Sequence, residues 1–162
     1  AAAGLPAGEV EPLLALYRRA HPGETPERLW FRIATDRGAR WNATRQAELK
    51  LAGGQAPVYL YYFAWNTPCD GGRLGAWHTA ELPLVMGLTL YPESEALSRQ
   101  LGAAWAAFAR TGDPSTPGLP WPAYTLERRS TMVWDAAGSR AVDDPDGAIR
   151  EALREHPSGG LL

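Results

Sequence analysis

The segment 57–65, PVYLYYFAW, restricts the possible folds of this chain more than any other stretch. Its β-branched and aromatic residues run almost without a break, and turn-forming sequence lies on both sides, with NTPCDGG following it. Such a run predicts a buried strand in a sheet that is covered on both faces. A shorter run at 131–135, TMVWD, predicts a second strand. Two strands bury too little surface for the helices around them, so this sheet needs more strands than the sequence offers.

Apolar residues at helical spacing predict helices on both sides of these strands. The first covers 10–17 and stops at HPG, the second runs from the capping pair Thr25 and Pro26 to about Arg37, and the third covers 42–51. A further helix is predicted to begin near Pro145.

The best-specified helix spans 93–110. Its apolar face, which we interpret as core, carries Leu97, Leu101, Ala104, Trp105 and Phe108. The alternation of helices and strands is typical of an α/β fold with an incomplete sheet and packed helices. No linker interrupts the pattern, so residues 1–162 are predicted to be part of a single domain.

Charge and cysteine content exclude several functions. Sixteen basic and eighteen acidic residues give a net charge of −2 without a block of like charge, which argues against nucleic acid as a partner. No apolar run approaches the roughly 20 residues of a membrane span. One cysteine, Cys69, and scattered histidines at 21, 78 and 156 predict no metal site. The start, AAAGLPAGEV, lacks a methionine and a signal-peptide layout, so we expect a chain cut from something longer.

The segment GAWHTAELPLVMG places His78 in a loop after the first predicted strand. A histidine beside apolar residues is usually packed or solvated, but α/β folds display reactive side chains at the carboxyl ends of strands. Glu81 follows three residues later. If a helix starts at or just after His78, the two side chains share a face and the acid can influence the imidazole.

The order of APVYLYYFAW, GAWHTAELPLVMG, EALSRQLGAAWAAFARTGDPSTPGLPWPAY and TMVWD resembles the C-terminal third of the type B carboxylesterase family, which includes bacterial p-nitrobenzyl esterases and cholinesterases. The resemblance covers roughly residues 24–150. It implies the C-terminal segment of an α/β-hydrolase fold, carboxylic esters as substrates, and no cofactor.

The resemblance also implies roles for single residues. His78 matches the histidine of the family's H-x-x-E motif, the general base of a serine, acid and histidine triad. Glu81 matches the glutamate that supports this site without being the triad acid. Trp77 and Trp65 either line the substrate pocket or pack the junction between strand and loop. Leu84 and Met86 stand where the family often has aromatic residues.

Two triad members have no counterpart in this sequence. The nucleophile elbow G-x-S-x-G does not occur in the 162 residues, and the family's acid lies farther upstream than the chain extends. We therefore expect the isolated chain to be inactive and to require the N-terminal remainder of the hydrolase fold as a partner. The alternative is a non-catalytic fragment or remnant that associates with that remainder or with another partner.

Other residues offer competing interpretations. Asp36 precedes His78 in the correct order for a triad acid, although the segment ATDRG resembles a structural part of the family. Cys69 and His78 could form a nucleophilic pair, but a lone thiol in a polar turn is usually incidental. His21 and His156 lie in segments that end helices, where solvated roles are expected.

Overall fold

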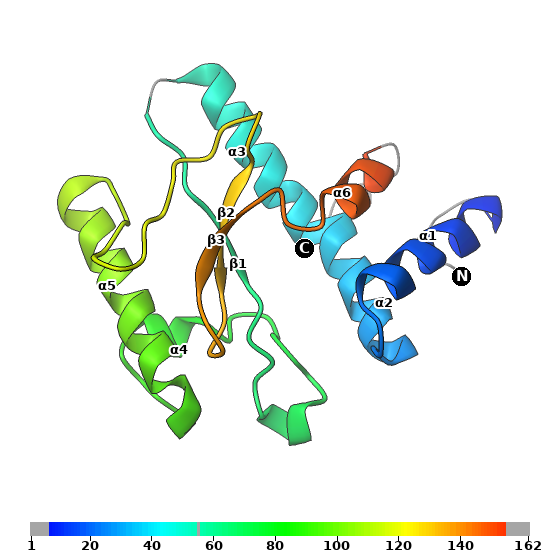
Figure 1. The fold of residues 1–162 in the computed structure, drawn as a ribbon, viewed down its shortest axis with the longest axis horizontal. Coiled ribbons are helices and arrows are strands. Elements are labelled where there is room, and N and C mark those ends of the chain that lie inside the picture. Colours follow the sequence, from blue (N-terminus) through cyan, green and yellow to red (C-terminus); the bar gives the residue numbers. More distant parts are fainter. Residues whose placement is uncertain (1–6, 55, 155–162) are drawn as a thin grey trace. The chain divides into compact units, whose positions relative to one another are not determined.

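The computed structural model describes residues 7–54 and 56–154, and these form two compact units (Figure 1). Unit 1 combines Ala1–Gly53 with Pro145–Leu162, and unit 2 comprises Gly54–Asp144. His156 lies outside the described residues. That residues 1–162 belong to a single domain stays a prediction.

Unit 1 is helical. Its elements are the helices α1 (Ala7–Ala20), α2 (Pro26–Thr35), α3 (Trp41–Gly53) and α6 (Gly147–Leu153), and a π-helical turn η1 (Asp36–Arg40). The predicted start of α2 is confirmed, because the Thr25 hydroxyl accepts a hydrogen bond from the Arg28 N–H at 3.3 Å. The α2 helix ends at Thr35 instead of about Arg37, and η1 joins it to α3 without a loop. The core side chains of this unit are Leu13, Tyr17, Leu29, Ile33, Ile149 and Leu153.

A buried polar network ties the helices of unit 1 together. The Tyr17 hydroxyl donates to Asp36 Oδ2 at 2.8 Å, and Arg40 donates to Asp36 Oδ1 at 3.2 Å. Arg40 also donates to Asp146 Oδ2 at 2.9 Å and to the Pro145 carbonyl oxygen at 2.5 Å, just before α6. Both oxygens of the Asp36 carboxylate are therefore engaged, and the network joins α1, η1 and the start of α6.

We expect Tyr17→Phe to lower the free energy of unfolding at pH 7 by about 1–3 kcal/mol, because it removes a buried hydrogen bond to a charged acceptor. Burial, reinforced by the charge of Asp36, raises the pKa of Tyr17 well above its usual value near 10. Above pH 10 the unfolded chain ionises this phenol and the folded chain does not, so the folded state loses stability as pH rises. Urea unfolding at pH 10 and 11 should show a loss roughly 1 kcal/mol larger in the native sequence than in Tyr17→Phe. Parallel curves for the two proteins would contradict this role of Tyr17.

Unit 2 contains a three-stranded sheet in the order β1 (Leu60–Phe63), β2 (Ser130–Trp134), β3 (Arg140–Asp143). The β1 and β2 strands are parallel, and β3 is antiparallel to β2. All five residues of β2 are buried, as expected for the central strand of the sheet. The β1 and β2 strands confirm the two strands predicted from the sequence, whereas β3 is not predictable because its four residues, RAVD, give little periodicity.

The expectation that the first strand is buried on both faces is wrong for these units. The β1 strand is partly buried, and Tyr61 is 37% exposed. The physical reason is that β1 is an edge strand within 56–144. It has a strand neighbour on one side only, so its side chains are covered less completely than those of the central strand β2. Burial on its other side requires partners beyond the described residues.

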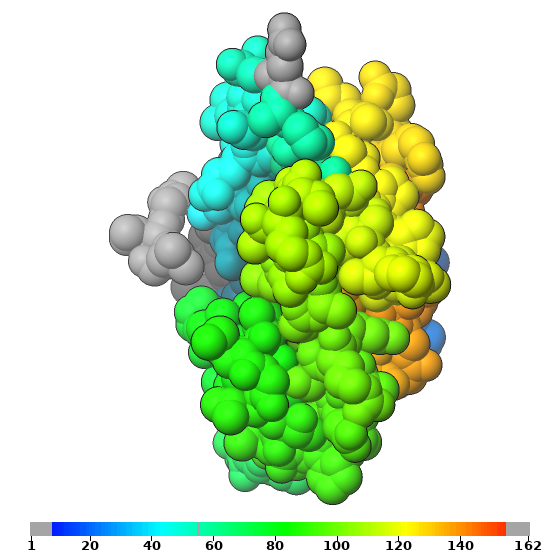
Figure 2. All heavy atoms as spheres, turned by 90° about the vertical axis from the view of Figure 1, so that its left-hand side faces the viewer, coloured from blue at the N-terminus to red at the C-terminus, as the bar shows by residue number. Residues whose placement is uncertain are grey.

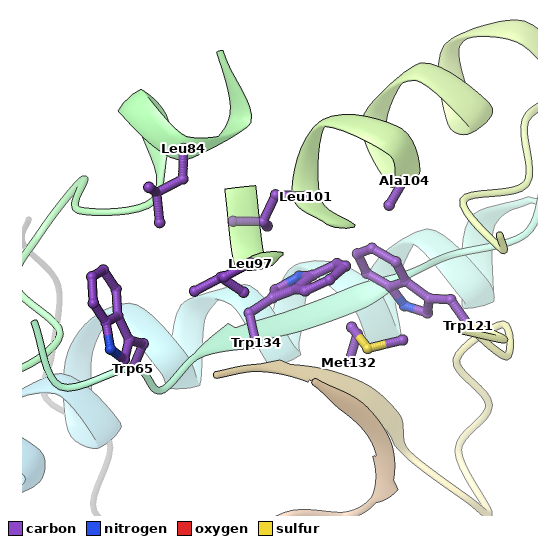
Figure 3. Packing of buried hydrophobic residues seen from close by; sticks show 8 residues of the cluster. All are labelled: Trp65, Leu84, Leu97, Leu101, Ala104, Trp121, Met132 and Trp134. Carbon is purple, nitrogen blue, oxygen red and sulfur yellow. The ribbon is translucent and has the colours of Figure 1, made fainter. Parts of the chain in front are cut away.

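The main core of unit 2 lies between the sheet and α5 (Glu95–Thr111), which follows a short 3-10 turn η3 (Pro92–Ser94). Met132 and Trp134 of β2 point toward the apolar face of α5 (Figure 3). The buried members of this core are Trp65, Leu84, Leu97, Leu101, Ala104, Trp121, Met132 and Trp134. The predicted stripe is confirmed except at its end, where Phe108 is 50% exposed. The α5 helix ends at Gly112, whose φ of 76° is the left-handed cap that glycine favours.

Among residues 7–54 and 56–154, no helix is both long enough and apolar enough to cross a bilayer.

Candidate functional site

His78 lies in a turn between β1 and the short helix α4 (Leu82–Val85). Two backbone hydrogen bonds shape this turn, from the Ala80 N–H to the Trp77 carbonyl oxygen and from the Leu82 N–H to the Thr79 carbonyl oxygen, both at 3.1 Å. The His78 side chain is exposed, and it has no hydrogen-bond partner among the residues that the structure describes. Its imidazole is therefore open to a group supplied from outside them.

The helix that would place His78 and Glu81 on one face does not form. Thr79 adopts a φ of 68°, in the left-handed region, and helical structure begins only at Leu82. His78 and Glu81 therefore lie at the two ends of a turn, which corrects the helical arrangement considered from the sequence.

A buried threonine closes the loop that precedes His78. Thr67 is 2% exposed, and its hydroxyl donates to the Gly75 carbonyl oxygen at 2.7 Å. Its backbone N–H reaches the same oxygen at 3.3 Å. The enclosed segment contains the 3-10 turn η2 (Cys69–Gly72), in which Asp70 has a φ of 52°. These bonds fix the loop at Gly75, three residues before His78.

The α4 helix, on the other side of the turn, is fixed to α5. The Ser98 hydroxyl donates to the Leu84 carbonyl oxygen at 2.8 Å in a buried position. A Cβ atom at Gly102 would lie 3.5 Å from the Val85 carbonyl oxygen, an ordinary contact distance, so α5 at this position lies directly against the end of α4. The green segment around α4 and the yellow-green α5 lie side by side in the space-filling view (Figure 2).

Glu81 has a partner that the sequence analysis did not predict. The hydroxyl of Tyr61, on β1, donates to Glu81 Oε1 at 3.2 Å. Burial, together with the charge and hydrogen bond of Glu81, raises the pKa of Tyr61 to about 12. The signal that could have suggested Tyr61 is a polar-tipped residue inside a strand that leads to the histidine loop.

The two tryptophans proposed for the pocket have different surroundings. Trp65 is 7% exposed and packs in the core, with its ring 6.0 Å from that of Tyr91. Trp77 is half-buried, and its indole Nε1 is buried without a hydrogen-bond partner among the described residues. Trp65 thus packs the junction between strand and loop, whereas Trp77 adjoins His78 in the turn.

The competing residues have other partners. Both Asp36 carboxylate oxygens are occupied by Tyr17 and Arg40, which indicates a structural role in unit 1. Cys69 is half-buried, and burial together with the neighbouring Cys69 thiol raises the pKa of Tyr91 above its usual value. His21 is half-buried, with its ring 6.2 Å from that of Tyr17. Within the described part of the chain, no group of three or more His, Cys, Asp or Glu side chains is placed to hold a metal ion.

Comparison with known proteins places this arrangement in a family. The sequence profile described as "Carboxylesterase family" matches residues 19–148. The para-nitrobenzyl esterase of Bacillus subtilis is 36% identical over 115 residues, which cover 65% of this chain and 23% of that protein. Human cocaine esterase is 36% identical over 87 residues, covering 46% of this chain and 16% of that protein.

Solved structures show the same relationship. The carboxylesterase EST55 of Geobacillus stearothermophilus superimposes with a TM-score of 0.72 and 36% identity, over 89% of this chain and 32% of that chain. An esterase of Clostridium hathewayi, described as hydrolysing aliphatic aromatic polyesters, gives a TM-score of 0.63 and 28% identity. The chain thus spans about a quarter to a third of these bacterial relatives. It has part of an α/β-hydrolase fold, and it belongs to the carboxylesterase family.

Proposed function

We propose that this chain supplies the general-base histidine, His78, of a carboxylic-ester hydrolase. The observation that carries the proposal is the family match over residues 19–148, within which His78 occupies a turn after β1 with an exposed imidazole that has no hydrogen-bond partner among the described residues. In this role His78 takes the proton of a serine hydroxyl as that oxygen attacks the ester carbonyl. It then returns a proton to the departing alcohol.

The serine and the acid come from outside this chain. Its 162 residues contain no G-x-S-x-G elbow, so the remainder of the hydrolase fold provides the nucleophile, the triad acid and the oxyanion hole. Glu81 supports the base from the carboxyl side of the turn. Trp77, next to His78, contributes to the substrate pocket, and Trp65 supports this region from the core. The chemistry needs no metal or organic cofactor, because the triad performs the covalent steps.

Two features of unit 2 support the remainder of the fold as the partner. The β1 strand has a neighbour on one side only within 56–144, which leaves an edge for another strand. Apolar side chains are also exposed beside the histidine turn, and they include Leu82, Met86, Leu88 and Leu90, with Met86 77% exposed. Monomeric proteins rarely leave such a cluster uncovered. The isolated chain, without the serine, is expected not to hydrolyse esters.

A chimeric esterase tests the proposal. The 162-residue chain replaces the matching segment of the Bacillus subtilis para-nitrobenzyl esterase, and hydrolysis of p-nitrophenyl acetate is measured. We expect turnover by the chimera and none above background by the chain alone. Cooperative melting, and binding of an apolar dye no greater than that of the parent esterase, would show that the chimera is folded. A folded chimera without turnover would contradict the proposal.

A further inference from the structure

We infer that Tyr61 is a positioning residue for the His78 turn, acting through the carboxylate of Glu81. The inference deepens the proposed function, because its catalytic consequence rests on His78 being the base. Its structural part, the ordering of the turn by a tyrosine on β1, can be measured without any ester being hydrolysed.

The first step is the rigidity of Tyr61 itself. Its backbone belongs to β1 and is in register with Met132 of the fully buried strand β2. Its ring meets Trp105 of α5 edge-on, with centroids 5.2 Å apart and planes at 74°, and lies 6.4 Å from Trp121. Edge-to-face contacts of this kind add to the burial of the rings. The hydroxyl is therefore presented from a fixed point between the sheet and α5.

The second step is the position of Glu81. This residue ends the turn and precedes α4, and its carbonyl oxygen accepts the first helical hydrogen bond from the Val85 N–H at 2.9 Å. Its side chain accepts from Tyr61 at 3.2 Å. The hydrogen bond from Tyr61 thereby links the carboxyl end of the turn to β1. The hydrogen bond from Thr67 to Gly75 holds the preceding loop. His78 lies between these two fixed points.

The third step is the charge of the pair. Glu81 is half-buried, and the Tyr61 hydroxyl is the only hydrogen-bond donor to its carboxylate among the described residues. Without that donor the carboxylate loses the hydrogen bond that compensates its partial desolvation. Its free energy is then lower when the side chain turns toward water. Because the pKa of Tyr61 is raised to about 12, the phenol stays protonated and donating over the whole range in which an imidazole titrates.

Hydrogen exchange of the 162-residue chain tests the structural part. Tyr61→Phe removes the hydroxyl that contacts Glu81. Tyr59→Phe is the matched control, because the Tyr59 ring also packs on Trp121, with centroids 6.2 Å apart, and its hydroxyl makes no hydrogen bond to Glu81 among the described residues. We expect amide exchange in residues 76–86 to be about fivefold faster in Tyr61→Phe than in Tyr59→Phe. Equal exchange in the two variants would overturn the inference.

Kinetics of the chimera test the catalytic part. Tyr61→Phe should lower kcat about fivefold and leave KM unchanged, and it should have no further effect in a Glu81→Ala background. Glu81→Gln keeps an acceptor oxygen for Tyr61 and should retain most of the activity that Glu81→Ala loses. Equal losses of kcat from Tyr61→Phe with and without Glu81 would overturn the coupling. If the folded chimera has no turnover, the proposed function fails, and hydrogen exchange alone decides the role of Tyr61.

Discussion

Replacing His78 by alanine in the chimeric esterase is expected to lower kcat about 10⁴-fold or more, the scale of loss when the base of a serine triad is removed. Without the imidazole, the serine hydroxyl must lose its proton to water, and the leaving alcohol receives none from a positioned acid. KM should change little, because His78 acts on the proton and not on the acyl or alcohol groups that fill the pocket.

The fold should not suffer from this substitution. The His78 side chain is exposed and makes no hydrogen bond to the described residues, so His78→Ala should change the free energy of unfolding by no more than about 0.5 kcal/mol. His21→Asn is a matched control, because His21 belongs to unit 1 and its ring lies near that of Tyr17. It should leave kcat within about twofold. Turnover of His78→Ala within about tenfold of the parent chimera would exclude His78 as the triad base.

Most helices of this protein can be predicted from the sequence because their signals are local. Thr25 followed by Pro26 specifies the start of α2, and the structure confirms the predicted cap. The burial of β1, in contrast, depends on partners that lie far away in the sequence, and the sequence of the strand itself does not specify them. Its apolar run predicts a buried strand in a sheet covered on both faces, and within 56–144 it is a partly buried edge strand with β2 as its one strand neighbour.

The residues of the candidate site also fall into those that the sequence predicts and those that only the folded structure reveals. His78 and Glu81 are predicted as site residues from their spacing and a family resemblance, both of which are visible in the sequence. Tyr61 was not found, because its partner lies 20 positions away and the contact exists only once β1 and the turn are folded. Trp65 could line a pocket or pack the core on sequence grounds alone, and its neighbours place it in the core.

Replacing Trp134 by alanine is expected to lower the free energy of unfolding of unit 2 by about 3–5 kcal/mol. Trp134 is fully buried at the end of β2, with its ring 5.5 Å from Trp121 and 6.3 Å from Trp105. Alanine would leave a cavity between β2 and α5, and the aromatic contacts would be lost with it. Amide exchange of β2 under increasing urea measures the effect within unit 2, without requiring both units to unfold together.

Two comparison variants separate the cavity from other causes. Trp134→Phe keeps an aromatic ring, and because the Trp134 Nε1 has no hydrogen-bond partner among the described residues, it should lose less than half as much stability as alanine. Trp30→Ala removes an indole that is 47% exposed on α2 and should leave β2 exchange unchanged. If the β2 amides are equally protected from exchange in the Trp134→Ala and Trp30→Ala variants, the core assigned to unit 2 is wrong.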